Sequence, residues 1–108
     1  MRMLLIALLF ATTMEPPETI LSNIYPNPGK DAELERVLRD NVAIMKKLDV
    51  IEPAPVVLVK QKDHYVMLFT WKSASIPDNA PPEIKKNWAE MRAVSRIEFE
   101  EVTPLVVK

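Results

Sequence analysis

Few side chains in this chain could do chemistry. Its 108 residues contain one histidine, His64, and no cysteine. Disulfides, thiolate zinc sites, iron–sulfur clusters and a cysteine nucleophile are therefore excluded, and a single histidine cannot build a His-rich metal site. His64 follows Lys62 and Asp63 in a short polar connection, where it could be a metal ligand, a general base or a solvated turn residue. We interpret it as a turn residue and expect no metal site.

An amide and a phenol lie on a short apolar segment near the N-terminus. Asn23 interrupts this segment and shares its parity with Leu21 and Tyr25. A buried amide without a hydrogen bond costs roughly 1–3 kcal/mol, so Asn23 is either a cavity group aimed at a ligand or a core amide bonded to backbone. We predict Asn23 as a catalytic residue. Tyr25 is predicted as its ligand-binding companion, with packing at the strand end as the alternative.

Two tryptophans could form an aromatic binding site. Trp88 lies on a helical apolar stripe, where core packing is the competing interpretation. Trp71 shares a strand parity with Phe69. If that parity faces a partner subunit, Trp71 lines a cavity or an interface, and if it faces the helices, Trp71 is core. We predict both tryptophans as ligand-binding residues, and the periodicity leaves the side of Trp71 open.

Charged residues near the C-terminus could be read as a catalytic cluster. Arg92 and Arg96 are followed by three carboxylates, Glu98, Glu100 and Glu101. Carboxylates can act as general acid and base, but nothing in the sequence fixes their separation. A solvated helix end and a charged edge strand, which discourages stray strand pairing, explain these residues better.

The elements that would position these residues follow from hydrophobic periodicity. We expect strands at 19–25, 56–61, 64–73 and 96–103, and helices from an N-cap at Asp31 to Leu48 and from a first helical residue at Pro82 to Ser95. The connection at 62–63 is short enough for an antiparallel hairpin. The order β-α-β-β-α-β predicts an α+β, ferredoxin-like domain, with a four-stranded antiparallel sheet and two helices on one face.

The central hairpin is apolar at both parities. One parity of its second strand carries Tyr65, Met67, Phe69 and Trp71, and the other carries Val66, Leu68 and Thr70. A continuous apolar run is typical of a strand buried on both faces. Because two helices cover only one face of a small sheet, we expect a second copy of the chain to cover the other. The predicted partner is therefore the chain itself, in a homodimer.

Charge and the N-terminal sequence limit the possible partners and suggest how the chain is organised. A net charge of −1 without a run of basic residues gives no footprint for nucleic acid. In residues 1–13, Arg2 precedes an apolar run that resembles a short export signal and is too short to span a bilayer. Alternatively Met14 is the true start, or the run 4–10 packs as an extra element. Localisation thus stays open between export and cytoplasm, with residues 14–108 as the folded domain.

The pattern as a whole resembles a known family. The hairpin ends in Leu68-Phe69-Thr70-Trp71-Lys72-Ser73, and it is followed by Pro82, Ile84, Trp88 and Met91 at helical spacing and by Phe99-x-x-Val102. Residues 18–106 resemble the dimeric α+β barrel superfamily and, within it, the antibiotic-biosynthesis-monooxygenase-like proteins. The resemblance implies a homodimer whose two sheets face each other around a cavity, and a small apolar or aromatic ligand.

The resemblance also suggests two activities. Members of the family include cofactor-independent oxygenases of aromatic polyketides and haem-degrading enzymes. The latter use a histidine of the second helix, an asparagine of the first strand and a nearby tryptophan; Asn23 matches the asparagine, and Trp88 lies near the tryptophan position. No histidine occurs between Ser73 and Arg96. We therefore expect no cofactor and a cofactor-independent monooxygenase-like protein, with a non-catalytic ligand-binding or interaction domain of the same fold as the alternative.

Overall fold

The computed structural model describes residues 16–105, so the predicted leader at 1–13 lies outside the described residues. The elements in chain order are β1 (Glu18–Pro26), α2 (Asp31–Lys47), β2 (Val57–Lys60), β3 (Tyr65–Trp71), the short 3-10 helix η1 (Pro77–Asn79), α3 (Pro82–Val94) and β4 (Ser95–Val102). The predicted β-α-β-β-α-β order is confirmed. No helix among residues 16–105 is long and apolar enough to cross a membrane.

The helices form where apolar residues recur at helical spacing. In α2 the buried side chains are Leu34, Val37, Leu38, Asn41 and Met45. Their spacing of three and four residues gives one stripe that faces the sheet. Pro82 is the first residue of α3, as predicted, because this position needs no backbone N–H donor. The predicted N-cap at Asp31 is wrong by one residue: Lys30 is the cap, and Asp31 supplies negative charge to the first helical turn.

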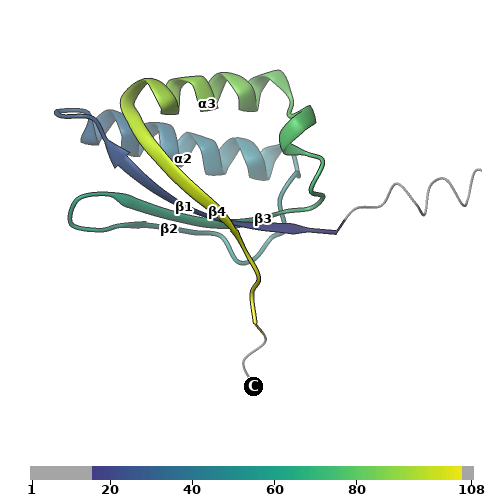
Figure 1. Ribbon diagram of the computed structural model, residues 1–108. Helices are drawn as coiled ribbons and strands as arrows, with labels where there is room; N and C mark the ends of the chain where they lie inside the picture. Colours follow the sequence, from purple (N-terminus) through teal and green to yellow (C-terminus); the bar gives the residue numbers. More distant parts are fainter. Residues whose placement is uncertain (1–15, 106–108) are drawn as a thin grey trace, which may run out of the picture.

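The four strands form one antiparallel sheet in the order β2-β3-β1-β4. Figure 1 shows both helices on one side of this sheet, with β4 crossing the front of the molecule. In the register, Ser22 of β1 lies between Met67 of β3 and Phe99 of β4. The ferredoxin-like α+β architecture is therefore confirmed, with two layers and one uncovered sheet face.

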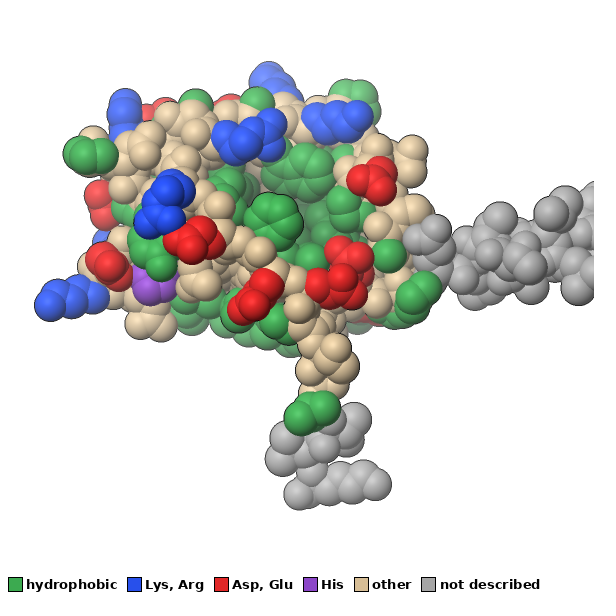
Figure 2. Space-filling model, in the orientation of Figure 1, with side chains coloured by type: hydrophobic (Ala, Val, Ile, Leu, Met, Phe, Trp, Pro, Cys, Tyr) green, Lys and Arg blue, Asp and Glu red, His purple; other side chains and the backbone are tan. Residues whose placement is uncertain are grey.

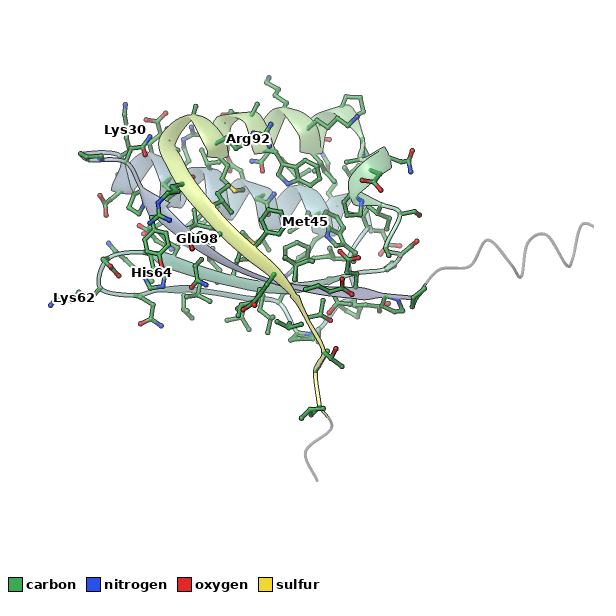
Figure 3. All side chains as sticks on the ribbon, viewed as in Figure 1. Lys30, Met45, Lys62, His64, Arg92 and Glu98 are labelled. Carbon is green, nitrogen blue, oxygen red and sulfur yellow. The ribbon has the colours of Figure 1, made fainter. Side chains whose placement is uncertain are left out.

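The helix side of the sheet holds the core. Tyr65, Met67, Phe69 and Trp71 are all buried, and so are Ile20 and Ile24 of β1. Met45, labelled in Figure 3, lies between α2 and the sheet and is fully buried. The parity of β3 that carries Trp71 therefore faces the helices, which settles the side that periodicity left open.

The other side of the sheet is what we call the open face. Its apolar residues are Leu21 of β1, Val57 and Val59 of β2, and Val66 and Leu68 of β3. Val57 and Val59 are 37% and 42% exposed, and the other three are half-buried. Neither helix covers this face (Figure 1). The two-sided apolar pattern of the hairpin thus corresponds to one face packed by helices and one face without a second layer from the described residues.

Candidate functional site

A cavity of about 600 Å³ lies on the helix side, between the sheet and the helices. Its walls are mostly apolar: Ile20, Ile24, Met67, Phe69, Trp71, Pro77, Trp88, Met91, Ile97 and Phe99, with the polar residues Glu18, Ser22, Asn41, Arg92 and Ser95. Figure 2 shows a hollow lined with hydrophobic side chains between the helix layer and β4. Cavities of roughly 300–1,000 Å³ with apolar walls and a few polar groups are typical small-molecule sites.

Three aromatic rings build one wall of the cavity. Trp71 meets Phe69 edge to face, with 5.0 Å between ring centroids, and meets Trp88 in the same way at 6.0 Å. Phe69 and Trp71 are adjacent members of the helix-facing row of β3, while Trp88 comes from α3. Because edge-to-face packing fixes ring orientation, these rings form a preformed apolar surface that suits a flat ligand.

Phe99 lies at the open side of the cavity. It points to the helix side of edge strand β4, as its register with Ser22 requires, yet it is 71% exposed. Its neighbours on the same side of β4 are the partly buried Ile97 and the exposed Glu101, so this end of the cavity wall faces solvent. The cavity is therefore open next to β4 (Figure 2).

A buried amide pair joins the two helices behind the aromatic wall. Asn41 Nδ2 donates to Asn87 Oδ1 at 2.8 Å, and Asn87 Nδ2 donates to the carbonyl of Val37 at 3.2 Å. Both side chains are almost fully buried. Asn87 was not predicted as a notable residue, although its spacing from Ile84 and Met91 places it on the apolar stripe of α3.

Two charged residues line the cavity, the partly buried Glu18 and the exposed Arg92. Arg92, labelled on α3 in Figure 3, is exposed and forms no salt bridge with any residue in the described range. Ser95 also lines the cavity, and its hydroxyl donates to the carbonyl of Met91 at 2.6 Å. The cavity therefore offers a cation near solvent and polar groups among apolar walls.

The structure divides the four predicted site residues between the two faces of the sheet. Trp71 and Trp88 line the cavity. Asn23 and Tyr25 have the opposite parity on β1 and lie half-buried on the open face. The expected arrangement of Asn23, Tyr25 and Trp71 around one cavity is therefore not present within the chain. Parity already separated Asn23 from its neighbour Ser22, but the sequence did not say which of the two faces the helices.

Tyr25 belongs to a stacked row on the open face. Its ring stacks on His64 at 4.8 Å, and the guanidinium of Arg96 lies over the ring at 4.3 Å. His64 Nδ1 also bonds Asp63 at 2.7 Å, and this hydrogen bond lowers the pKa of the Asp63 carboxyl. Figure 3 labels His64 at the turn between β2 and β3. The predicted turn position of His64 is confirmed, and its ring packs on Tyr25 rather than standing free in solvent.

The carboxylates of β4 do not form a metal site. Arg96 pairs with Glu98, whereas Glu100 and Glu101 point to opposite sides of the strand. Within residues 16–105 no group of three or more His, Cys, Asp or Glu side chains could hold a metal ion. The interpretation of these residues as a charged, solvated edge strand fits their exposure.

Comparison with known proteins supports the fold. No protein-family model matches the chain, and no curated protein matches it. Among solved structures, SnoaB, a cofactor-independent oxygenase from Streptomyces nogalater, gives a TM-score of 0.70 at 18% identity, covering 85% of this chain and 96% of that chain. A protein from Bacteroides thetaiotaomicron, provisionally named an antibiotic biosynthesis monooxygenase, gives a TM-score of 0.71 at 19% identity. The match covers 84% of this chain and 91% of that chain.

A third structure extends the same pattern. A protein from Caulobacter crescentus with the same provisional name gives a TM-score of 0.62 at 20% identity, covering 87% of this chain and 96% of that chain. The chain therefore has the fold of antibiotic-biosynthesis-monooxygenase-like structures, which confirms the resemblance found in the sequence at the level of architecture.

Proposed function

We propose that this chain binds a small, flat, largely apolar molecule in the cavity between its sheet and its helices. The observation that carries the proposal is the cavity itself, about 600 Å³ in volume and walled by Phe69, Trp71 and Trp88. Two buried amides fix the helices above it, so the site exists before the ligand arrives. A preformed apolar site loses little conformational entropy on binding, which favours affinity.

The reaction proposed for this site is oxygenation without a cofactor. A ring CH₂ flanked by electron-withdrawing groups loses a proton to solvent at the open side of the cavity, and the resulting anion gives an electron to O₂. Recombination forms a C–O bond, and the peroxide anion takes a proton back from solvent. Loss of water from the hydroperoxide leaves a carbonyl, so that CH₂ and O₂ become C=O and H₂O. The protein would orient the substrate and exclude water. The cationic side chain of Arg92 at the rim favours the anionic form electrostatically. The fold shared with SnoaB supports this chemistry.

We further propose that two copies pair through the open face. Val57 and Val59 are exposed there beside the half-buried Leu21, Val66 and Leu68. A contiguous apolar patch on a sheet face is a typical protein interface. Face-to-face packing of two such sheets buries these side chains without involving the cavity, which lies on the other side.

A second candidate is a ligand-binding domain without catalysis. The residues that line the cavity include no histidine, cysteine, tyrosine or lysine, so among them Glu18 is the one side chain that commonly acts as a proton acceptor. Fold alone does not imply an enzyme. In this case the same cavity would hold its ligand unchanged.

The two candidates are separated by one set of measurements. Purified protein is mixed with a hydroxyanthrone, and oxygen consumption and the ligand mass are followed together. If the protein is an oxygenase, oxygen is consumed and the product has gained one oxygen atom and lost two hydrogen atoms. If the protein only binds the ligand, native mass spectrometry shows a complex that contains the unchanged ligand. Trp88→Ala should impair either behaviour, whereas Asn23→Ala on the open face should impair neither. The cavity assignment fails if Asn23→Ala abolishes turnover or binding while Trp88→Ala has no effect.

A further inference from the structure

Ser22 presents an unpaired hydroxyl to the cavity. It lies on the helix-facing row of β1, between Ile20 and Ile24, and only 7% of it is exposed. Its sheet neighbours are Met67 and Phe99, which offer no strong hydrogen-bonding group. Its hydroxyl makes no hydrogen bond to any described residue. A buried hydroxyl without a partner costs free energy, so this position calls for a ligand or solvent partner.

Asn41 presents an unpaired carbonyl oxygen to the same cavity. The orientation of its amide is fixed by the network behind it, because Asn87 Nδ2 donates to the Val37 carbonyl and so turns Asn87 Oδ1 toward Asn41. Asn41 must therefore donate to Asn87 Oδ1 through Nδ2, so the Oδ1 atom of Asn41 is left as the unused acceptor. No described residue donates a hydrogen bond to Asn41 Oδ1.

Both free atoms are open to the cavity rather than sealed in the core. Among the described residues, no side-chain N or O atom is both fully enclosed and without a hydrogen-bond partner. Ser22 Oγ and Asn41 Oδ1 have no hydrogen-bond partner among residues 16–105, so each must retain some accessible surface. Since both residues line the same cavity and are more than nine-tenths buried, that surface faces the cavity.

We infer that Ser22 and Asn41 together form a polar anchor for a ligand hydroxyl inside the cavity. This inference rests on the proposed ligand-binding function and narrows it to a class of ligand. Asn41 Oδ1 can only accept, whereas the Ser22 hydroxyl can donate or accept. A ligand O–H satisfies both, because it donates to Asn41 and accepts from Ser22.

Other ligand groups satisfy the anchor less well. A carbonyl oxygen pairs with Ser22 but leaves Asn41 Oδ1 facing another acceptor. A carboxylate has the same defect and must also lose its hydration among apolar walls. A hydrocarbon leaves both anchor atoms unpaired. The anchor therefore selects a neutral hydroxylated ring over a bare ring or an acid of the same shape.

The test compares naphthol, naphthalene and naphthoate near neutral pH, with tryptophan fluorescence as the readout because both tryptophans line the cavity. Wild type should bind naphthol at least about fivefold more tightly than either other probe, the effect of one net hydrogen bond. Ser22→Ala should weaken naphthol binding by about fivefold and leave naphthalene binding unchanged. Ser73→Ala is the matched control, because Ser73 does not line the cavity and its hydroxyl is already bonded to Ser75, and it should not alter the preference.

The outcomes separate the anchor from the cavity. If naphthol and naphthalene bind equally well to wild type, or Ser22→Ala leaves the naphthol preference intact, the anchor is refuted while ligand binding in the cavity stands. If none of the three probes binds, both the anchor and the proposed function are refuted.

A second measurement needs no ligand. Ser22→Ala should leave the melting temperature unchanged or raise it, because no protein hydrogen bond is lost. Ser95→Ala should lower it. A fall for Ser22→Ala as large as that for Ser95→Ala would show that the Ser22 hydroxyl serves the fold, and would overturn the inference.

Discussion

The indole of Trp88 stands edge to face against the indole of Trp71, with 6.0 Å between the ring centroids. The two rings come from different layers, α3 and β3, and both line the cavity. Trp71 is 3% exposed, whereas Trp88 is half-buried. One ring therefore belongs mainly to the core and the other mainly to the site.

The first prediction separates these two roles. Trp71→Ala should reduce the free energy of unfolding by about 3–5 kcal/mol, as for other buried aromatic truncations. Trp88→Ala should cost about 1–2 kcal/mol, within the ordinary range of single substitutions, but should weaken naphthol binding. Urea unfolding measures the first effect; competition against a fluorescent ligand measures the second. Equal loss of stability in the two variants would contradict this division.

The second prediction concerns the open face. Val59→Lys places a charge within the proposed interface, so the dimer should dissociate at micromolar concentration in sedimentation equilibrium. Ala89→Lys adds the same charge to the exposed surface of α3 and should leave the dimer intact. Wild-type protein that sediments as a single chain would rule out pairing through this face.

The third prediction concerns pH. Burial raises the pKa of the Tyr65 hydroxyl above its usual value of about 10. The folded state thus holds this proton more tightly than the unfolded state. The corresponding stability is complete below the unfolded pKa and is lost as pH rises through the folded pKa. Unfolding free energies in urea above about pH 9 should fall less steeply for Tyr65→Phe than for wild type. If the free energy of unfolding falls equally steeply with pH in both proteins, the raised pKa of Tyr65 is contradicted.

The fourth prediction tests the amide pair. Asn87→Ala leaves Asn41 Nδ2 without its acceptor in a buried site, so the free energy of unfolding should fall by about 1–3 kcal/mol. Asn79→Ala removes an exposed amide bonded to the Ser75 carbonyl at 3.1 Å and should change stability by less than about 0.5 kcal/mol. The interpretation fails if the exposed and the buried substitutions cost the same.

Most of the architecture could be predicted because apolar periodicity determines it. The stripe of α2 and the alternation in β3 gave the element types and their order, with boundaries that differ by at most two residues from the structure. The largest difference is at the end of β3, which was predicted to reach Ser73 and ends at Trp71. A strand ends where hydrogen bonding to its neighbouring strand ends, and the local sequence does not specify that neighbour.

The site was harder to predict for a specific reason. β3 is apolar at both parities, so its sequence is compatible with helices on either face, and only the packing of the helices assigns Trp71 to the cavity. The same assignment moves Ser22 into the cavity and Asn23 to the open face. Asn41 and Asn87 did leave a signal: each is an amide on an otherwise apolar helical stripe, and two such residues on neighbouring helices suggest a buried pair.

The location of the cavity has a consequence for stoichiometry. The cavity lies on the helix side of the sheet, and the open face is on the reverse side. An assembly joined at that reverse side keeps two separate chambers, each with its own entrance beside β4. Titration to saturation would then end at one guest molecule per polypeptide. The two chambers would fill independently, and no guest would be shared across the twofold axis.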